Sequence, residues 1–221
     1  MSHWQVDLYI GHYSELYKRQ DELSILLSED EKARAARFIS NTVRDRFIIG
    51  RGFLRKTLAR YTQTPIRFIY GVRNKPYVKG VSFNLSHSQD VLLLAVTRGE
   101  VALGVDVEAI RPMKEMETVA RDNFSDWEYQ QWSTLPQSTR TKAFYTCWTR
   151  KEAYIKAVGD GFALPLDAFD VSVLPDDDPP DILRADGDDP HRWRLYHLEP
   201  EAGYVGALCI AGEAEISVPF D

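Results

Sequence analysis

A helical pattern over residues 144–158 constrains the fold of this chain more than any other feature. Its apolar positions recur at spacings of three, four and seven, as on one face of an α-helix; they are Phe144, Cys147, Trp148, Ile155 and Val158. Gly159 and Gly161 follow, and glycine after the last periodic residue is typical of a helix end. Glu152 and Lys156 are four residues apart, so they lie one turn apart on this helix. Taken alone, such a pair is a surface ion pair that contributes about 0.3–0.5 kcal/mol.

A second pattern, over residues 101–108, alternates residue by residue and predicts a β-strand. Its apolar face carries Val101, Leu103, Val105 and Val107, and its other face carries Ala102, Gly104, Asp106 and Glu108. The two carboxylates are therefore about 7 Å apart on the same side of the strand. Gly104 on that side leaves room for another group to approach the backbone. Taken alone, this is the pattern of an amphipathic strand with a polar outer face.

The two patterns together resemble a known family, the surfactin-synthetase-associated 4′-phosphopantetheinyl transferases. The main matching segments are Gly104-Val105-Asp106-Val107-Glu108 and, about forty residues later, Trp148-Thr149-Arg150-Lys151-Glu152-Ala153-Tyr154-Ile155-Lys156. Three shorter blocks agree in order and rough spacing: Lys75-Pro76, Asn84-Leu85-Ser86-His87-Ser88 and Asn123-Phe124-Ser125-Asp126-Trp127-Glu128. Looser agreement extends to Arg34, Arg37-Phe38 and the stretch from Arg46 to Arg51. Five blocks in the family's order, over about residues 75–162, make the resemblance specific.

The resemblance implies an α+β fold of two similar subdomains related by a pseudo-twofold axis. Each subdomain is expected to be a small, mostly antiparallel sheet packed with a long helix, with the active site in the cleft between them. We expect residues 1–105 to form the N-terminal subdomain and residues 106–221 the C-terminal one. The order of predicted strands and helices also favours the α+β class.

The resemblance further implies transfer of the 4′-phosphopantetheine arm of coenzyme A to a serine hydroxyl of an apo acyl or peptidyl carrier protein, releasing 3′,5′-ADP. The transfer would depend on Mg²⁺, with Mn²⁺ as an alternative metal. Two other classes stay open. One is another Mg²⁺-dependent enzyme that transfers phosphoryl groups or cleaves pyrophosphate. The other is a non-catalytic module that binds coenzyme A or a carrier protein, and the intact set of acidic and basic residues argues against it.

Within this resemblance, Asp106, Glu108 and Glu152 hold the metal ion, since Mg²⁺ prefers carboxylate oxygens and substrate phosphates. Lys156 neutralises charge on the pyrophosphate, and Glu152 is the expected general base for the acceptor hydroxyl. A metal-bound water or Glu128 is the alternative base. Glu128 also completes a capping-box pattern with Ser125, which is a full structural explanation for it.

The nucleotide end of coenzyme A is expected to meet a set of polar and cationic residues, which the resemblance identifies as Arg34, Arg46, Lys75, Pro76, Ser86 and His87. Arg46, Lys75 and His87 are assigned to the 3′-phosphate, and Arg34 is a weaker candidate. The other cations between residues 44 and 56 are expected to form a solvated face.

Composition narrows the classes of function. The net charge of −6 over 221 residues argues against bulk nucleic-acid binding. The longest apolar run, Val91 to Val96, is too short to span a bilayer, and the N-terminus lacks a secretory pattern. Cys147 and Cys209 lie in apolar periodic segments and are expected to be buried thiols of a reducing cytoplasm. One chain carries both acidic motifs, so a functional monomer is expected.

The rest of the pattern predicts further elements. Strands are expected at 6–10, 66–70, 169–173, 193–198 and 204–210. Helices are expected at 28–38, at 42–61 with Thr42 as its cap, between Pro112 and Asn123, and at 128–132. Residues 91–97 and 101–108 are expected to form a hairpin joined at 98–100. Residues 175–190 carry seven aspartates and four prolines, which predicts a loop. A carrier protein is expected to dock near residues 111–132, through Met113 and Met116.

Overall fold

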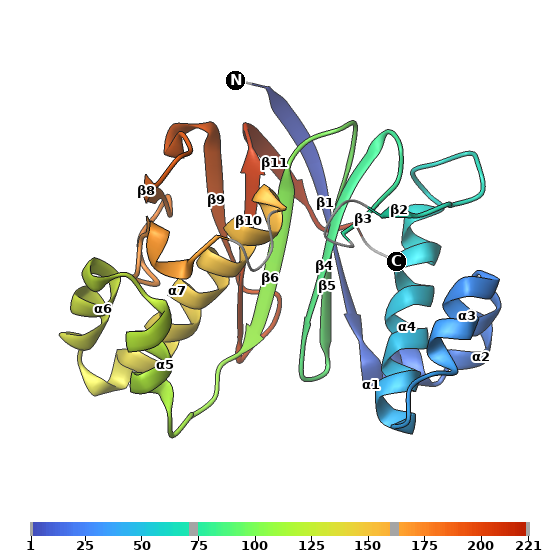
Figure 1. The fold of residues 1–221 in the computed structure, drawn as a ribbon, viewed down its shortest axis with the longest axis horizontal. Helices are drawn as coiled ribbons and strands as arrows, with labels where there is room; N and C mark the ends of the chain where they lie inside the picture. The colour runs from blue at the N-terminus through green and yellow to red at the C-terminus, as the bar shows by residue number, and fades with distance from the viewer. Residues whose placement is uncertain (1, 71–74, 160–163, 220–221) are drawn as a thin grey trace.

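The computed structural model describes residues 2–70, 75–159 and 164–219, and it confirms the expected α+β class (Figure 1). Two β-sheets form the middle of the molecule. The first sheet has the order β11-β1-β5-β4, from β11 (Glu213–Ser217), β1 (His3–His12), β5 (Val91–Arg98) and β4 (Val81–Ser88). The second sheet has the order β6-β10-β9, from β6 (Leu103–Ala109), β10 (Tyr204–Ala211) and β9 (Trp193–Leu198).

A helical layer covers the outer face of each sheet (Figure 1). Beside the first sheet lie α1 (Tyr13–Tyr17), α2 (Gln20–Ile25), α3 (Glu29–Ala35) and α4 (Asn41–Leu58). Beside the second sheet lie α5 (Met116–Asn123), α6 (Asp126–Ser133) and α7 (Gln137–Val158). The smaller elements are the strand pairs β2 (Ile69–Tyr70) with β3 (Pro76–Tyr77) and β7 (Phe169–Val171) with β8 (Ile182–Ala185), and the 3₁₀ turns η2 (Leu166–Ala168) and η3 (Pro190–Arg192).

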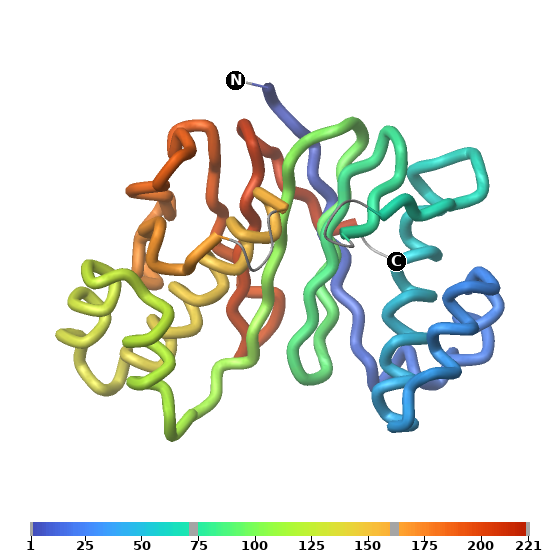
Figure 2. The backbone as a smooth tube through the Cα atoms, viewed as in Figure 1, coloured from blue at the N-terminus to red at the C-terminus, as the bar shows by residue number. Residues whose placement is uncertain are grey.

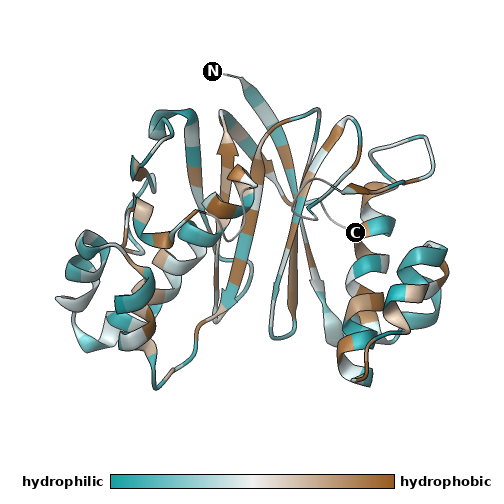
Figure 3. Cartoon of the chain, viewed as in Figure 1, coloured by the Kyte–Doolittle hydropathy of each residue, from teal (hydrophilic) through white to brown (hydrophobic). Residues whose placement is uncertain are grey.

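Strand β5 lies at the centre of the molecule and is buried on both faces. One face, Leu92, Leu94 and Val96, packs with α4 residues such as Ile49. The other face, Val91, Leu93 and Ala95, packs against the second sheet. A strand covered on both sides needs no polar alternation, which explains the uninterrupted apolar run and the hydrophobic colouring along β5 in Figure 3.

The expected hairpin of residues 91–97 and 101–108 is wrong. Strand β5 pairs with β1 and β4, whereas β6 pairs with β10 in the second sheet. The connection is short enough for a hairpin, but β4 already occupies the edge of β5 that β6 would need. Gly99, with φ of 98°, starts the crossing and lies against Trp4, where an added Cβ would come within 2.7 Å of the indole ring.

Three other local predictions need correction. The long helix α4 is capped by Ser40, whose Oγ accepts a hydrogen bond from Val43 N at 3.4 Å, rather than by Thr42. Residues 175–190 are not all loop, because they contain β8, which pairs with β7. The helices α1 and α2 were not predicted. Gly159 does end α7 with φ of 79°, whereas Gly161 lies outside the described residues.

The C-terminal strand β11 was also not predicted, and it lies beside the N-terminal strand. Figure 2 shows the blue and red ends of the tube side by side, and β1 pairs with β11 in parallel from His3↔Glu213 to Asp7↔Ser217. The first sheet therefore contains segments from both ends of the chain. The division into subdomains at residue 105 stays a prediction; that position lies inside β6.

No helix in the described part of the chain combines the length and the apolar character that crossing a membrane requires.

Candidate active site

The two sheets meet along a polar seam between their edge strands β4 and β6. Alternate residues of β4 point at β6 because successive side chains of a strand face opposite ways. Ser82 Oγ accepts from Val101 N at 2.8 Å, and Asn84 Oδ1 accepts from Val105 N at 2.9 Å. Side chains thus replace the backbone ladder that would otherwise join two neighbouring strands.

The next two residues of this series hold the two predicted carboxylates. Ser86 Oγ donates to Asp106 Oδ1 at 2.7 Å. Ser88 Oγ donates to Glu108 Oε2 at 2.6 Å and accepts from Ala109 N at 3.1 Å. Asp106 is only 4% exposed, so its side of the strand is not the solvated face that the alternation alone suggested. The seam therefore fixes both acids in place.

Helix α7 brings Lys156 into contact with the same seam and carries Glu152 near enough to interact electrostatically with Asp106. It approaches β6 at Gly104, where an added Cβ would come within 2.2 Å of Ala153 O, a backbone atom that has no room to move. One turn further on, Lys156 Nζ donates to Asp106 Oδ1 at 2.6 Å and to Ser86 Oγ at 3.0 Å. The interpretation of Glu152 and Lys156 as a simple surface pair is therefore wrong for Lys156.

The three acids influence one another electrostatically. Burial raises the pKa of Glu152, the charge of Asp106 raises it further, and Lys156 opposes both effects. Burial likewise raises the pKa of Glu108, and Asp106 adds to that rise against the hydrogen bond from Ser88 and the charge of Lys156. Burial is the larger cause of both shifts, and the like charge of Asp106 adds to it because it disfavours ionisation of a nearby carboxyl.

The chemistry of these residues fits a hard divalent cation. Asp106 Oδ2 is buried and has no hydrogen-bond partner among the described residues, and a cation would satisfy it. Within residues 2–70, 75–159 and 164–219, no three His, Cys, Asp or Glu side chains form a group that could hold a metal ion as they stand. The carboxylate oxygens at the seam are the donors that Mg²⁺ or Mn²⁺ prefers.

A cavity of about 570 Å³ opens between α4 and β4. It is lined by Arg46, Arg51, Lys75, Pro76 and His87 together with aromatic and aliphatic side chains. His87 points into it, while its neighbours on β4, Ser86 and Ser88, point to the carboxylates. A single strand thus serves the cavity on one face and the acidic seam on the other.

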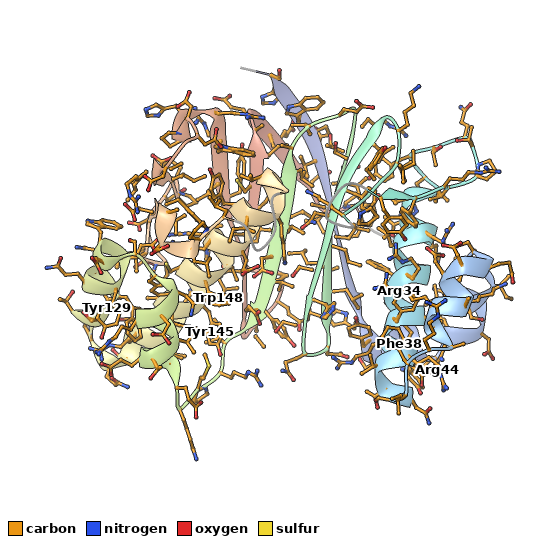
Figure 4. The ribbon with its side chains drawn as sticks, in the orientation of Figure 1. Arg34, Phe38, Arg44, Tyr129, Tyr145 and Trp148 are labelled. Atoms are coloured by element: carbon orange, nitrogen blue, oxygen red, sulfur yellow. The ribbon has the colours of Figure 1, made fainter. Side chains whose placement is uncertain are left out.

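The cations of this cavity differ in their surroundings. Arg46 is exposed, stacks over the ring of Tyr13 at 4.7 Å and donates to Gln89 O at 3.0 Å. His87 packs edge-on against Tyr13, and partial desolvation, with the charges of Arg46 and Lys156, lowers its pKa. Arg34 does not line the cavity; Figure 4 shows it beside α4, and it stacks on Phe47 at 5.2 Å.

Arg51 is a cavity residue that the sequence did not single out. It was expected on a solvated face, yet its side chain is 13% exposed and its Nε lies 3.5 Å from the buried carboxylate of Glu31. Its Nη1 is buried without a partner among the described residues. Arg55 Nε binds the same carboxylate at 2.6 Å, so the solvated face is wrong for both residues. Nothing in the sequence around Arg51, which is one of several cations that follow Arg46, indicates that its side chain is buried.

Glu128 has a structural position. It completes the capping box of α6 with Ser125, as the sequence indicated. Its two oxygens lie 2.7 and 2.6 Å from Lys151 Nζ, and they also accept from Ser125 N and Val171 N. Glu128 and Lys151 are fully buried, so no free oxygen of Glu128 faces the seam. These contacts exclude Glu128 as the alternative base.

The expected docking residues also differ from one another. Met116 is 8% exposed and belongs to the core around α7, so it is not a surface contact. Met113 is partly buried against the same core. Figure 4 shows Tyr129 and Tyr145 on this side of the molecule, away from the labelled Arg34 and Phe38.

Comparisons of the sequence with known proteins agree on one family. Residues 102–209 match the 4′-phosphopantetheinyl transferase superfamily. The chain is 37% identical over 200 residues to the 4′-phosphopantetheinyl transferase HetI of Nostoc sp., covering 86% of this chain and 81% of the relative. It is 30% identical over 191 residues to the transferase Sfp of Bacillus subtilis, covering 84% and 82% respectively. The crystal structure of Thermotoga maritima holo-[acyl-carrier-protein] synthase matches 52% of this chain and 65% of its own at 17% identity, with a TM-score of 0.41.

Proposed function

The chain belongs to the 4′-phosphopantetheinyl transferase superfamily, and on that premise we propose how its residues divide the work of the reaction. The enzyme is a phosphopantetheinyl transferase, and its family moves the 4′-phosphopantetheine arm of coenzyme A to carrier proteins. Two parts of the molecule would carry that work, the cavity between α4 and β4 and the acidic seam between β4 and β6.

The cavity between α4 and β4 is proposed to hold the nucleotide end of coenzyme A. Its volume of about 570 Å³ lies in the range of small-molecule sites. Arg46 and His87 would contact the 3′-phosphate, since charge-assisted hydrogen bonds to phosphate are strong. Arg51 adds a cation to the same wall, and Pro76, which also lines the cavity, would lie beside the adenine. Arg34 would act from outside the cavity by supporting Phe47, which lines it.

The acidic seam is proposed to hold the pyrophosphate and a metal ion. Asp106, Glu108 and Glu152 would bind Mg²⁺ or Mn²⁺, supported by the unpartnered Asp106 Oδ2 and by the carboxylate oxygens that such ions prefer. A bound divalent ion would neutralise charge on the pyrophosphate as the leaving group departs. Ser86 would keep Asp106 in its rotamer. Lys156 would supply a second positive charge beside Asp106.

In the transfer step, the serine oxygen of the carrier forms a bond to the phosphorus that bears the pantetheine arm. The bond from that phosphorus to the bridging oxygen breaks, and 3′,5′-ADP leaves. Glu152 would accept the hydroxyl proton as the general base. The remaining residues align the reactants and stabilise charge.

One observation carries this proposal: His87 of β4 lines the cavity, and the adjacent Ser86 binds Asp106. The proposed sites for the nucleotide and for the pyrophosphate are therefore next to each other, on the two faces of one strand. The buried free thiols Cys147 and Cys209 support a cytoplasmic location, where thiols stay reduced.

The test is intact-mass spectrometry of several apo acyl and peptidyl carrier proteins after incubation with the enzyme, coenzyme A and Mg²⁺. We expect each substrate carrier to gain the mass of one phosphopantetheinyl group. A carrier with its acceptor serine replaced by alanine is the matched control and should gain nothing. Coenzyme A cleavage without carrier modification would instead indicate a pyrophosphate-cleaving enzyme, and binding without turnover a non-catalytic module.

A further inference from the structure

Lys75 joins three segments that are far apart in the sequence. It directly precedes β3, and its Nζ donates to Leu103 O, at the start of β6, at 3.1 Å. The same Nζ also donates to Lys156 O, in the last turn of α7. The ammonium group is therefore directed at two backbone carbonyls, although Lys75 is also one of the residues that line the cavity between α4 and β4.

One of these two carbonyls, Lys156 O, has a structural reason to receive a cation. The last four carbonyls of an α-helix have no partner within the helix, and its C-terminus carries partial negative charge. Lys156 lies in that last turn, since α7 ends at Val158. Lys75 thus acts as a cap supplied from another part of the chain.

Lys75 binds the backbone of Lys156, and the side chain of Lys156 reaches the acidic seam. Lys156 O accepts from Lys75, while Lys156 Nζ donates to Asp106 Oδ1 at 2.6 Å. Helix α7 and β6 touch directly at Gly104, where a Cβ would come within 2.4 Å of Ala157 N. No side chain separates the two backbones there, and Lys75 adds a hydrogen-bonded bridge between the same two elements.

We propose that Lys75 is a positioning residue, which holds the end of α7 on β6 through Leu103 O and Lys156 O and so sets Lys156 Nζ against Asp106. This inference rests on the role proposed above for Lys156. It differs from a phosphate contact, because the ammonium of Lys75 is already used by the protein backbone. Lys75 then connects the wall of the nucleotide cavity with the group that acts on the pyrophosphate.

The test is a double-mutant cycle between Lys75→Met and Lys156→Ala, with kcat and KM measured for coenzyme A and for dephospho-coenzyme A. Met keeps the stem of Lys75 in the cavity wall and removes its donors. We expect Lys75→Met to lower kcat at least tenfold, equally with both nucleotides, and to change KM less than threefold. In the Lys156→Ala background, Lys75→Met should change kcat less than twofold, since the group it positions is gone.

Arg46→Ala is the comparison variant, because Arg46 is proposed to contact the phosphate and should change KM for coenzyme A alone. Lys75→Gln, which keeps a donor on a shorter side chain, should give an intermediate kcat and replaces Lys75→Met if that variant does not fold. A selective rise in KM for coenzyme A with unchanged kcat would overturn the inference in favour of a phosphate contact. Additive losses in the cycle would overturn it as well.

The same cycle separates this inference from the proposed function. If Lys156→Ala turns over like the wild type, the proposed role of Lys156 fails and the inference fails with it. If Lys156→Ala is slow and Lys75→Met is not, only the inference fails.

Discussion

Ser86 and Lys156 hold the same oxygen of Asp106 but differ in what they contribute. The serine hydroxyl fixes the rotamer of the carboxylate at 2.7 Å without changing its charge. Lys156 contributes positive charge at 2.6 Å. The position of the Asp106 side chain and the charge beside it therefore depend on different neighbours. A substitution of Asp106 that keeps the hydrogen bond from Ser86 but removes the negative charge isolates the electrostatic role of the carboxylate.

Asp106→Asn is such a substitution. The amide oxygen can still accept from Ser86, but Lys156 and a metal ion lose their anionic partner. We expect kcat to fall by about 10³-fold, the upper range for loss of one charge-stabilising group. Circular dichroism should match the wild type, and titration calorimetry should show weaker Mg²⁺ binding. Wild-type turnover in this variant would remove Asp106 from the proposed mechanism.

Glu152→Gln tests the proton acceptor. The glutamine has the same size but no basicity, so kcat should fall by about 10²-fold while KM for coenzyme A stays near the wild-type value. Single-turnover kinetics with a carrier protein measures the chemical step directly. Equal losses in kcat and in coenzyme A affinity would mean that Glu152 acts mainly in binding.

Arg46→Ala tests the nucleotide cavity. Arg46 is exposed, and its guanidinium contacts the Tyr13 ring and Gln89 O near the protein surface, so its removal should leave the fold intact. Binding of coenzyme A should weaken by about tenfold or more, as for a lost charge-assisted bond, while dephospho-coenzyme A should change little. Calorimetry with both nucleotides measures this. Equal loss for both would remove the 3′-phosphate assignment.

At the scale of elements, α7 is held along its length by different kinds of lysine contact. Lys151 pairs with Glu128 in the core and donates to Phe169 O at 2.9 Å, so it joins α7 to α6 and β7. Lys142, nearer the start of α7, pairs with Glu199 at 2.8 Å on the surface. The two ion pairs have similar lengths and differ in burial, which makes them a natural comparison.

Lys151→Met should lower the free energy of unfolding by about 3–5 kcal/mol, because it leaves the carboxylate of Glu128 buried and uncompensated. Lys142→Met, the exposed match on the same helix, should cost only about 0.2–1 kcal/mol. Urea denaturation of both variants measures the difference. Adding Glu128→Gln to Lys151→Met should recover part of the loss, and a variant pair of equal stability would contradict the burial argument.

The same elements show what the sequence can and cannot predict. The periods of α7 and β6 predicted both elements, and the alternation of β6 put Asp106 and Glu108 on one side of the strand, because periodicity is a local property. That both acids are held by serines of β4 was not predicted. The pairing of β5 with β6 was predicted wrongly. The short connection at residues 98–100 favours a hairpin and gives no indication that β4 pairs with β5 instead. β8 was missed because its composition is that of a loop, while its support comes from Arg184 Nε bound to Asp170 at 2.8 Å.

The candidate site was predicted in its composition more than in its geometry. The acids and Lys156 followed from motif spacing together with a family resemblance. The reach of Lys75 to two carbonyls, and the burial of Arg51 beside Glu31, depend on contacts between segments distant in the chain. Nothing in local spacing encodes such contacts, and only the folded structure reveals them.

At the scale of the whole molecule, the four layers bring the parts of the site together within one chain. The first sheet contributes Ser86 and His87, the second contributes Asp106 and Glu108, and α7 contributes Glu152 and Lys156. Each of these groups comes from one chain, so the candidate site needs no second copy of the protein. We therefore propose that a monomer is the functional state.

Sedimentation analysis of the active enzyme tests the monomer. We expect one species near the mass of a single 25.4 kDa chain, with transfer activity proportional to its concentration. Adding the carrier protein should produce a complex that contains one enzyme chain. Activity confined to a dimeric or trimeric fraction would contradict the proposal.

The parallel pairing of β1 with β11 affects how the molecule is made. Asp7 and its partner Ser217 are 210 residues apart, and a ribosome adds about 5–20 residues per second. The edge of β1 that pairs with β11 therefore stays unpaired for roughly 10–40 s, until β11 has been synthesised. An unpaired strand edge is a template for another chain. Neighbouring nascent chains on one messenger RNA would carry the same open edge, so synthesis gives β1 an opportunity to pair with another chain before β11 exists.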